Sequence, residues 1–109
     1  MADENEEGYI YMREQIGPVV AGKFYPGERN GLIDKIEDCY TQKYGPGKLP
    51  EVSDRELSSP AGLIAPHAGY SYSGPVAAHA FSWLAQLGKP NSVIIIGTNH
   101  SGFGPAASI

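Results

Sequence analysis

The stretch that decides the fold is Gly62–Phe81, which reads GLIAPHAGYSYSGPVAAHAF. An apolar run in it stops at Pro66, and a histidine, His67, follows at once. We predict a strand over residues 61–65, because the run is short, apolar and followed by a proline that has no N–H to donate to a neighbouring strand. A titratable ring directly after a buried strand is unusual, so the position of His67 needs an explanation.

A helix is predicted over residues 75–87, because Pro75 suits a first helical turn and Gly88 is a typical stop. A second strand is predicted over residues 92–97, where the sequence SVIIIG is a continuous β-branched run of the kind buried on both faces of a sheet. Strand, helix and strand in this order form a βαβ unit with parallel strands and a right-handed crossover. The fold class expected from the sequence is therefore α/β.

Upstream of this unit, apolar residues recur at helical spacing within residues 29–44, with charged residues on the opposite face. We predict an amphipathic helix there, ended by Gly45 and Pro46. The lone cysteine, Cys39, lies on the apolar stripe and is interpreted as a small buried side chain. Residues 45–60 are rich in glycine, proline and polar residues, so this long loop is either a tolerated surface insertion or a functional flap.

The predicted topology gives His67 a first explanation. In parallel sheets ligands bind at the carboxyl ends of the strands, and both predicted strands end in a histidine, His67 after the first and His100 after the second. Neighbouring strands lie about 4.8 Å apart, close enough for two imidazoles to reach one metal ion. The alternative is that both are loop histidines bonded to the backbone, because a non-haem metal site usually needs a third protein ligand. Spacing alone leaves both interpretations open.

Charge and cysteine content limit the possible partners. Residues 1–11 carry four acidic groups and no Lys or Arg, and the rest of the chain carries eight acidic and eight basic groups. We interpret residues 1–16 as an acidic flexible leader, with Met12 as an alternative start of translation. No basic face for nucleic acid or for a lipid surface is evident, and no apolar run is long enough to span a bilayer. A single cysteine excludes an internal disulfide and suits a reducing, cytoplasmic location.

Three blocks, VAGKFYP, GLIAPHAGYSYSGPVAAHAF and VIIIGTNHSGFG, occur in an order that resembles the MEMO family. The resemblance implies that residues 17–109 are the N-terminal part of a MEMO-like domain. The family fold is similar to that of class III extradiol dioxygenases, an α/β domain around a mixed sheet with a non-haem metal pocket. The sheet would be incomplete in this chain, so a second chain could be needed to complete it.

The resemblance also assigns roles to individual residues. His67 and His100 match the family's first and second metal-binding histidines, which would hold iron or copper. Cys39 does not match the family's ligand cysteine, which lies later in the chain. The cleft for a small-molecule or phosphopeptide-like ligand is expected to be lined by Phe24, Tyr25 and Tyr72, which match family aromatics. Tyr70 and Asn99, which follow the ends of the two predicted strands, are expected there as well.

Two functions follow from the resemblance. The first is metal-dependent redox or oxygen chemistry in the full-length form, of which this chain would be a truncated or fragmentary member. Tyr72 or His79 would orient the substrate or move a proton, although His79 is interpreted first as a packed or capping residue. The second is a non-enzymatic module that holds a phosphorylated or anionic ligand on the backbone N–H groups at the start of the helix containing Pro75. A third interpretation is an incomplete fragment with no activity of its own. Sequence composition does not separate the three.

Overall fold

A computed structural model of the protein describes residues 17–104 and 106–107. They fall into two compact units, Val20–Val93 in one and the described parts of Met1–Val19 and Ile94–Ile109 in the other. The predicted acidic leader and the alternative start at Met12 lie outside the described residues.

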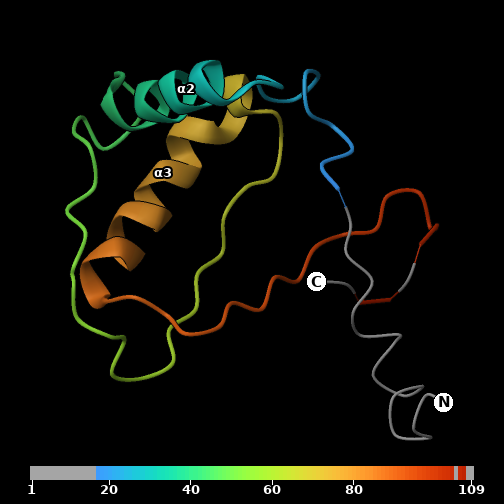
Figure 1. The fold of residues 1–109 in the computed structure, drawn as a ribbon. Coiled ribbons are helices and arrows are strands. Elements are labelled where there is room, and N and C mark those ends of the chain that lie inside the picture. The colour runs from blue at the N-terminus through green and yellow to red at the C-terminus, as the bar shows by residue number, and fades with distance from the viewer. Residues whose placement is uncertain (1–16, 105, 108–109) are drawn as a thin grey trace, which may run out of the picture. The chain divides into compact units, whose positions relative to one another are not determined.

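The first helix, α2, spans Arg29–Thr41 (Figure 1). Its N-terminus is capped by the side chain of Glu28, whose carboxylate accepts hydrogen bonds from the backbone N–H groups of Asn30 and Gly31. A carboxylate is well placed at this end of a helix, where the unpaired N–H groups carry partial positive charge. The helix ends at Thr41 rather than at residue 44, because the chain turns there and the Gly47 N–H donates to the Tyr40 carbonyl at 2.8 Å.

The second helix, α3, spans Tyr70–Leu87 and contains Pro75 in its interior. The prediction of a start at residue 75 is therefore wrong at the N-terminal end. Proline has no N–H, so Pro75 cannot donate the usual helical hydrogen bond to the Ser71 carbonyl. The loss of one such bond is tolerated when the surrounding turns are well paired. Gly69 takes the N-cap position instead. Among the described residues, no helix combines the length and the apolar character that crossing a membrane requires.

The long loop of residues 45–60 is tied to the end of α3. The Ser53 N–H donates to the Ala85 carbonyl at 2.9 Å. The Lys89 N–H donates to the Arg55 carbonyl at 2.9 Å, and the Lys89 carbonyl accepts from the Leu57 N–H at 3.0 Å. Gly88, with φ at 140°, lets the chain pass so close to this loop that a Cβ there would lie 2.8 Å from the Leu57 nitrogen. These contacts favour a structural role for the loop over that of a free flap.

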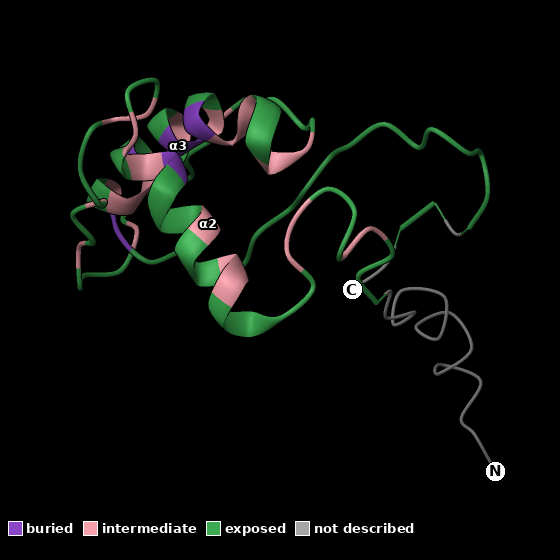
Figure 2. Ribbon diagram, turned by 90° about the horizontal axis from the view of Figure 1, so that it is seen from above, coloured by how far each residue is buried: buried purple, intermediate pink, exposed green. Residues whose placement is uncertain are grey.

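The core of this unit lies where α2 and α3 pack together (Figure 2). Within the described part of the chain, the buried hydrophobic residues are Cys39 on α2 and Ala78 on α3. Gly74 makes the close approach possible, because a Cβ at this position would lie 2.4 Å from the Cys39 sulfur. A core of this size is small for a chain of 109 residues, which normally hides roughly two-thirds of its unfolded surface.

The two predicted strands are not formed in the described residues. Residues 61–65 and 92–97 run without a ladder partner, and the described β-pairing is limited to two isolated bridges, Ala21 with Tyr25 and Glu56 with Lys89. The physical reason is that a strand is defined by its neighbour, and a short apolar run without one cannot pair its backbone. Regular structure in the described residues is therefore limited to the two helices and the two bridges, and the predicted βαβ unit is reduced to its helix.

Candidate functional site

A cavity of about 450 Å³ opens in the unit formed by residues 20–93. Four segments surround it: the turn at residues 20–25, α2, the segment of residues 66–68, and α3. Its walls are mainly apolar and aromatic, and they include the imidazole of His67. An apolar pocket with a few polar groups is the usual form of a small-molecule site.

The aromatic residues expected to line a ligand cleft come together at this cavity. Phe24, Tyr25 and Tyr70 all line it, and the rings of the two tyrosines lie 5.3 Å apart at an angle of 39°. The turn that carries Phe24 is fixed to α3, because the Tyr70 N–H donates to the Phe24 carbonyl at 2.9 Å. Gly69 allows this approach, since a Cβ there would lie 3.3 Å from the Phe24 carbonyl oxygen.

The two histidines of the proposed metal site occupy different units. His67 is exposed at the edge of the cavity and precedes the N-cap of α3 by two positions. His100 is also exposed and belongs to the unit formed by the two ends of the chain. Within the residues that the structure describes, no group of three or more His, Cys, Asp or Glu side chains is placed to hold a metal ion. The described residues therefore do not form a complete metal centre.

Asn99, expected in the ligand cleft, has its side chain engaged in a local turn. Its Oδ1 accepts hydrogen bonds from the Gly102 N–H at 2.8 Å and from the Ser101 hydroxyl at 3.2 Å, and its Nδ2 donates to the Phe103 carbonyl at 2.9 Å. Asparagine often organises a turn in this way. In this structure Asn99 shapes the loop that contains His100.

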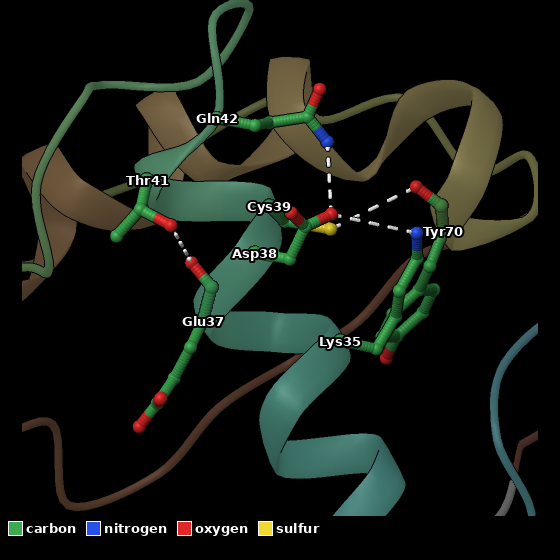
Figure 3. Close-up of polar contacts among 7 residues, drawn as sticks. All are labelled: Lys35, Glu37, Asp38, Cys39, Thr41, Gln42 and Tyr70. Atoms are coloured by element: carbon green, nitrogen blue, oxygen red, sulfur yellow. Dashed lines mark hydrogen bonds and ion pairs between the residues drawn. The ribbon is translucent and has the colours of Figure 1, made fainter.

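Cys39 has the structural surroundings expected from its place on an apolar stripe. Its sulfur faces the Tyr70 carbonyl oxygen at 3.8 Å across the contact between α2 and α3 (Figure 3), and the residue is 4% exposed. Burial raises the pKa of the Cys39 thiol, and Asp38 raises it further, while Lys35 acts in the opposite direction. A protonated thiol is a poor nucleophile and a poor metal ligand, so a packing role fits best.

The two residues considered for proton transfer or substrate orientation lie away from the cavity wall. Tyr72 is 87% exposed, and it is absent from the cavity lining. The Nε2 of His79 lies 3.0 Å from the carbonyl oxygen of Tyr44, so its ring links α3 to the segment that follows α2. This contact matches the interpretation of His79 as a packing or capping residue.

The start of α3 also bears on the interpretation of the protein as an anion-binding module. The Tyr70 N–H donates to Phe24, and the N–H groups of Tyr72 and Ser73 both donate to the Gly69 carbonyl, at 2.9 and 3.1 Å. An anion bound at a helix N-terminus needs backbone N–H groups that point outward without another acceptor. These three donors already have acceptors in the protein, so the arrangement does not favour anion binding there.

Several lining residues were not anticipated as site residues. Ile36 and Tyr40 on α2 and Ala77 and Phe81 on α3 all face the cavity. Each pair has the spacing of neighbouring turns on one helix face, which is also the signal of an ordinary core stripe. Helical periodicity could identify the faces that turn inward, but it could not show that they enclose a cavity.

Comparison of the sequence with known proteins identifies the relatives of this chain. A family model described as "Memo-like protein" matches residues 17–109. A MEMO1 family protein of Thermotoga neapolitana is 50% identical over 93 residues, which cover 84% of this chain and 34% of that protein. A MEMO1 family protein of Ignicoccus hospitalis is 52% identical over 92 residues, 84% of this chain and 32% of that protein.

A relative of lower identity is matched over the same share of this chain. A MEMO1 family protein of Methanobrevibacter smithii is 45% identical over 93 residues, 84% of this chain and 33% of that protein. The chain thus spans about a third of the length of these curated relatives. No solved structure matches the chain.

Proposed function

Because this chain belongs to the MEMO family, we propose that His67 and His100 are two of the protein ligands of a non-haem iron or copper site. In the whole family domain such a site would support redox or oxygen chemistry. Neutral imidazole is a good ligand for both metals. The proposal concerns the ligands that this chain supplies, and the remaining ligands would come from the part of the family domain beyond the matched region.

The position of His67 carries the proposal. Its imidazole stands at the edge of an aromatic-walled cavity, two positions before the N-cap of a long helix. His67 itself lies in the segment of residues 66–68, which lines the cavity and leads directly into α3. Phe24 and its turn are fixed to the same helix end by the hydrogen bond from Tyr70. The metal ligand and the aromatic wall of the cavity would therefore both be attached to the start of α3.

The described residues do not complete this site, and no reaction step is assigned to them. Two imidazoles alone bind a divalent ion weakly and without a fixed geometry. We propose that the whole domain has an α/β fold similar to that of class III extradiol dioxygenases, in which further strands pair with residues 61–65 and 92–97. This fold would bring the ends of both segments, and therefore both histidines, to one edge of a sheet.

The cavity suits a small molecule with an apolar or aromatic part. The rings of Tyr25 and Tyr70 and the side chain of Phe81 offer the surface on which such a ligand would pack. Burial raises the pKa of the Tyr40 phenol, with Cys39 adding to the effect, so this group stays protonated and able to donate a hydrogen bond. We propose that a substrate enters here with its polar end toward His67.

Native mass spectrometry tests the ligand assignment. The chain is loaded anaerobically with Fe(II), and separately with Cu(I) or Cu(II), at millimolar metal. We expect one weakly bound ion per chain, lost when both His67 and His100 are replaced by alanine. The control is His79→Ala, which removes an imidazole that bonds to Tyr44 and should leave the bound ion in place. A bound ion that the double variant retains as strongly as the unchanged chain would contradict the proposal.

A further inference from the structure

The helix α3 is unusually apolar for a helix with an exposed side. Its 18 residues, Tyr70–Leu87, include no Asp, Glu, Lys or Arg. A helix on the surface of a globular protein normally carries charged residues on its outer face, and one that is hydrophobic all round is normally buried. The composition of α3 is therefore that of a helix covered on more than one side.

Three large side chains form a stripe along the exposed side of α3. Tyr72, Val76 and Trp83 are separated by four and then seven residues, the spacing that places side chains on one face of a helix. They are 87%, 57% and 49% exposed, respectively. His79 lies between Val76 and Trp83 on the same face. We call Tyr72, Val76 and Trp83 the α3 stripe.

The α3 stripe lies away from the face that contacts α2. Gly74 approaches the Cys39 sulfur, and Ala78 is buried. At 100° per residue these two positions lie about 200° and 240° around the helix from Tyr72. One side of α3 is thus packed within its own unit, and the opposite side presents an apolar surface that is interrupted by His79, whose ring contacts the Tyr44 carbonyl.

A second apolar surface occurs independently in the chain. Ile94, Ile95 and Ile96 are 90%, 87% and 94% exposed, although a continuous β-branched run is typical of a strand buried on both faces. Soluble monomers rarely expose such surfaces unless another molecule or segment covers them. Both the stripe and the run have the composition of interior elements.

We propose that the α3 stripe binds the polypeptide of the family domain that lies beyond the region matched here. The matched region is 34% of the Thermotoga neapolitana relative and 32% of the Ignicoccus hospitalis relative, so about two-thirds of the family domain lies outside it. That length is enough to supply a second layer for α3. An uncharged stripe selects an apolar surface, as the interior face of the same domain would provide. The inference does not depend on metal binding by His67 and His100.

The single tryptophan provides a direct probe, because Trp83 is the only one in the chain. The chain is labelled with 5-fluorotryptophan and mixed with a separately produced, unlabelled polypeptide, the part of the Thermotoga neapolitana relative beyond its matched region. We expect a complex with one copy of each polypeptide and a new position for the single fluorine resonance. That resonance should also become less sensitive to exchange of H₂O for D₂O, since the indole ring is then shielded from solvent.

Two variants that add the same charge distinguish the stripe from other surfaces. Val76→Lys should weaken the complex by on the order of tenfold or more, because an unpaired ammonium group would be buried. Thr41→Lys, at an exposed position on α2, should leave the affinity unchanged. Circular dichroism of each variant alone shows whether the helices are retained.

The remaining outcomes would overturn the proposal. They are absence of a complex, a complex equally tight with Val76→Lys, or a fluorine resonance that keeps its free position in the complex. A fluorine shift that appears with the labelled chain alone as its concentration rises would identify a second copy of this chain as the occupant instead. Each result can be read without any metal present, so failure here is distinct from failure of the metal proposal.

Discussion

Replacing Gly74 by alanine tests the contact between α2 and α3 quantitatively. The added Cβ would lie 2.4 Å from the Cys39 sulfur, far inside the 3.4–4 Å of ordinary van der Waals contact. Cys39 is 4% exposed, so its sulfur has little room to move aside. Overpacking of this kind costs about 1–3 kcal/mol. Alanine also favours a helix over glycine by about 0.8–1 kcal/mol. The net expectation is a loss of about 1 kcal/mol.

A second background isolates the steric part of this effect. In a Cys39→Ala chain the sulfur is gone, and the other neighbours of the new Cβ, Cys39 Cβ and Tyr70 Cβ, lie at an ordinary 3.5 Å. Gly74→Ala should then raise the free energy of unfolding by about 0.8–1 kcal/mol, the helix preference alone. The coupling between the two substitutions should therefore equal the overpacking cost, about 1–3 kcal/mol.

Urea unfolding followed by circular dichroism measures the free energy of unfolding of the four chains in this double-mutant cycle: the unchanged chain, the two single variants and the double variant. Independent sites add to within about 0.5 kcal/mol. If Gly74→Ala changed the stability equally in both backgrounds, to within that limit, the packing of α2 on α3 through Gly74 and Cys39 would be refuted.

Three further predictions concern other parts of the same unit. Gly88→Ala should lower the free energy of unfolding by about 1–3 kcal/mol, because the position has φ at 140° and a Cβ would meet the Leu57 nitrogen. The control in urea unfolding is Gly62→Ala, since no atom lies within 4 Å of a Cβ at that position. Equal losses of stability in the two variants would contradict this prediction. Because burial raises the pKa of Cys39, the rate of its reaction with a disulfide reagent should rise at higher pH than the rate for a small free thiol. In urea the pH profile should return to that of the free thiol. If the folded chain and the free thiol had the same profile, the thiol would be exposed. His79→Ala should cost about 0.5–1.5 kcal/mol in urea unfolding by removing the bond to Tyr44, and a loss of metal binding in the same variant would contradict its structural role.

The helices were largely predictable because their signals are local. The apolar spacing in α2 requires only the chain itself, and the structure places that helix at Arg29–Thr41. The start of α3 was predicted wrongly, because Pro75 looks like the first turn of a helix when read alone. The structure shows that Gly69 caps the helix and that Tyr70 is held by Phe24, a residue far away in sequence. A long-range hydrogen bond of this kind leaves no periodic signal.

The strands and the site depended on partners that periodicity cannot reveal. The run at residues 92–97 is chemically suited to a buried strand, but strand formation requires a paired neighbour, and the described residues provide none for it. Phe24 and Tyr25 are expected in a cleft by resemblance to a family, and Tyr70 by its place after the first predicted strand; the structure brings all three to one cavity with His67. Asn99 is also expected in the cleft, yet its amide is engaged in the turn from Ser101 to Phe103.

The account's central claim is that His67 and His100 bind the same metal ion. Pulsed electron paramagnetic resonance of the Cu(II)-loaded chain, in complex with the remaining part of the Thermotoga neapolitana relative, tests it directly, because the remote imidazole nitrogens modulate the signal and the modulation depth counts how many rings are bound. We predict that each single variant, His67→Ala or His100→Ala, binds one imidazole fewer than the unchanged chain, and that His79→Ala binds the same number. An unchanged number of imidazoles in either single variant would contradict the claim.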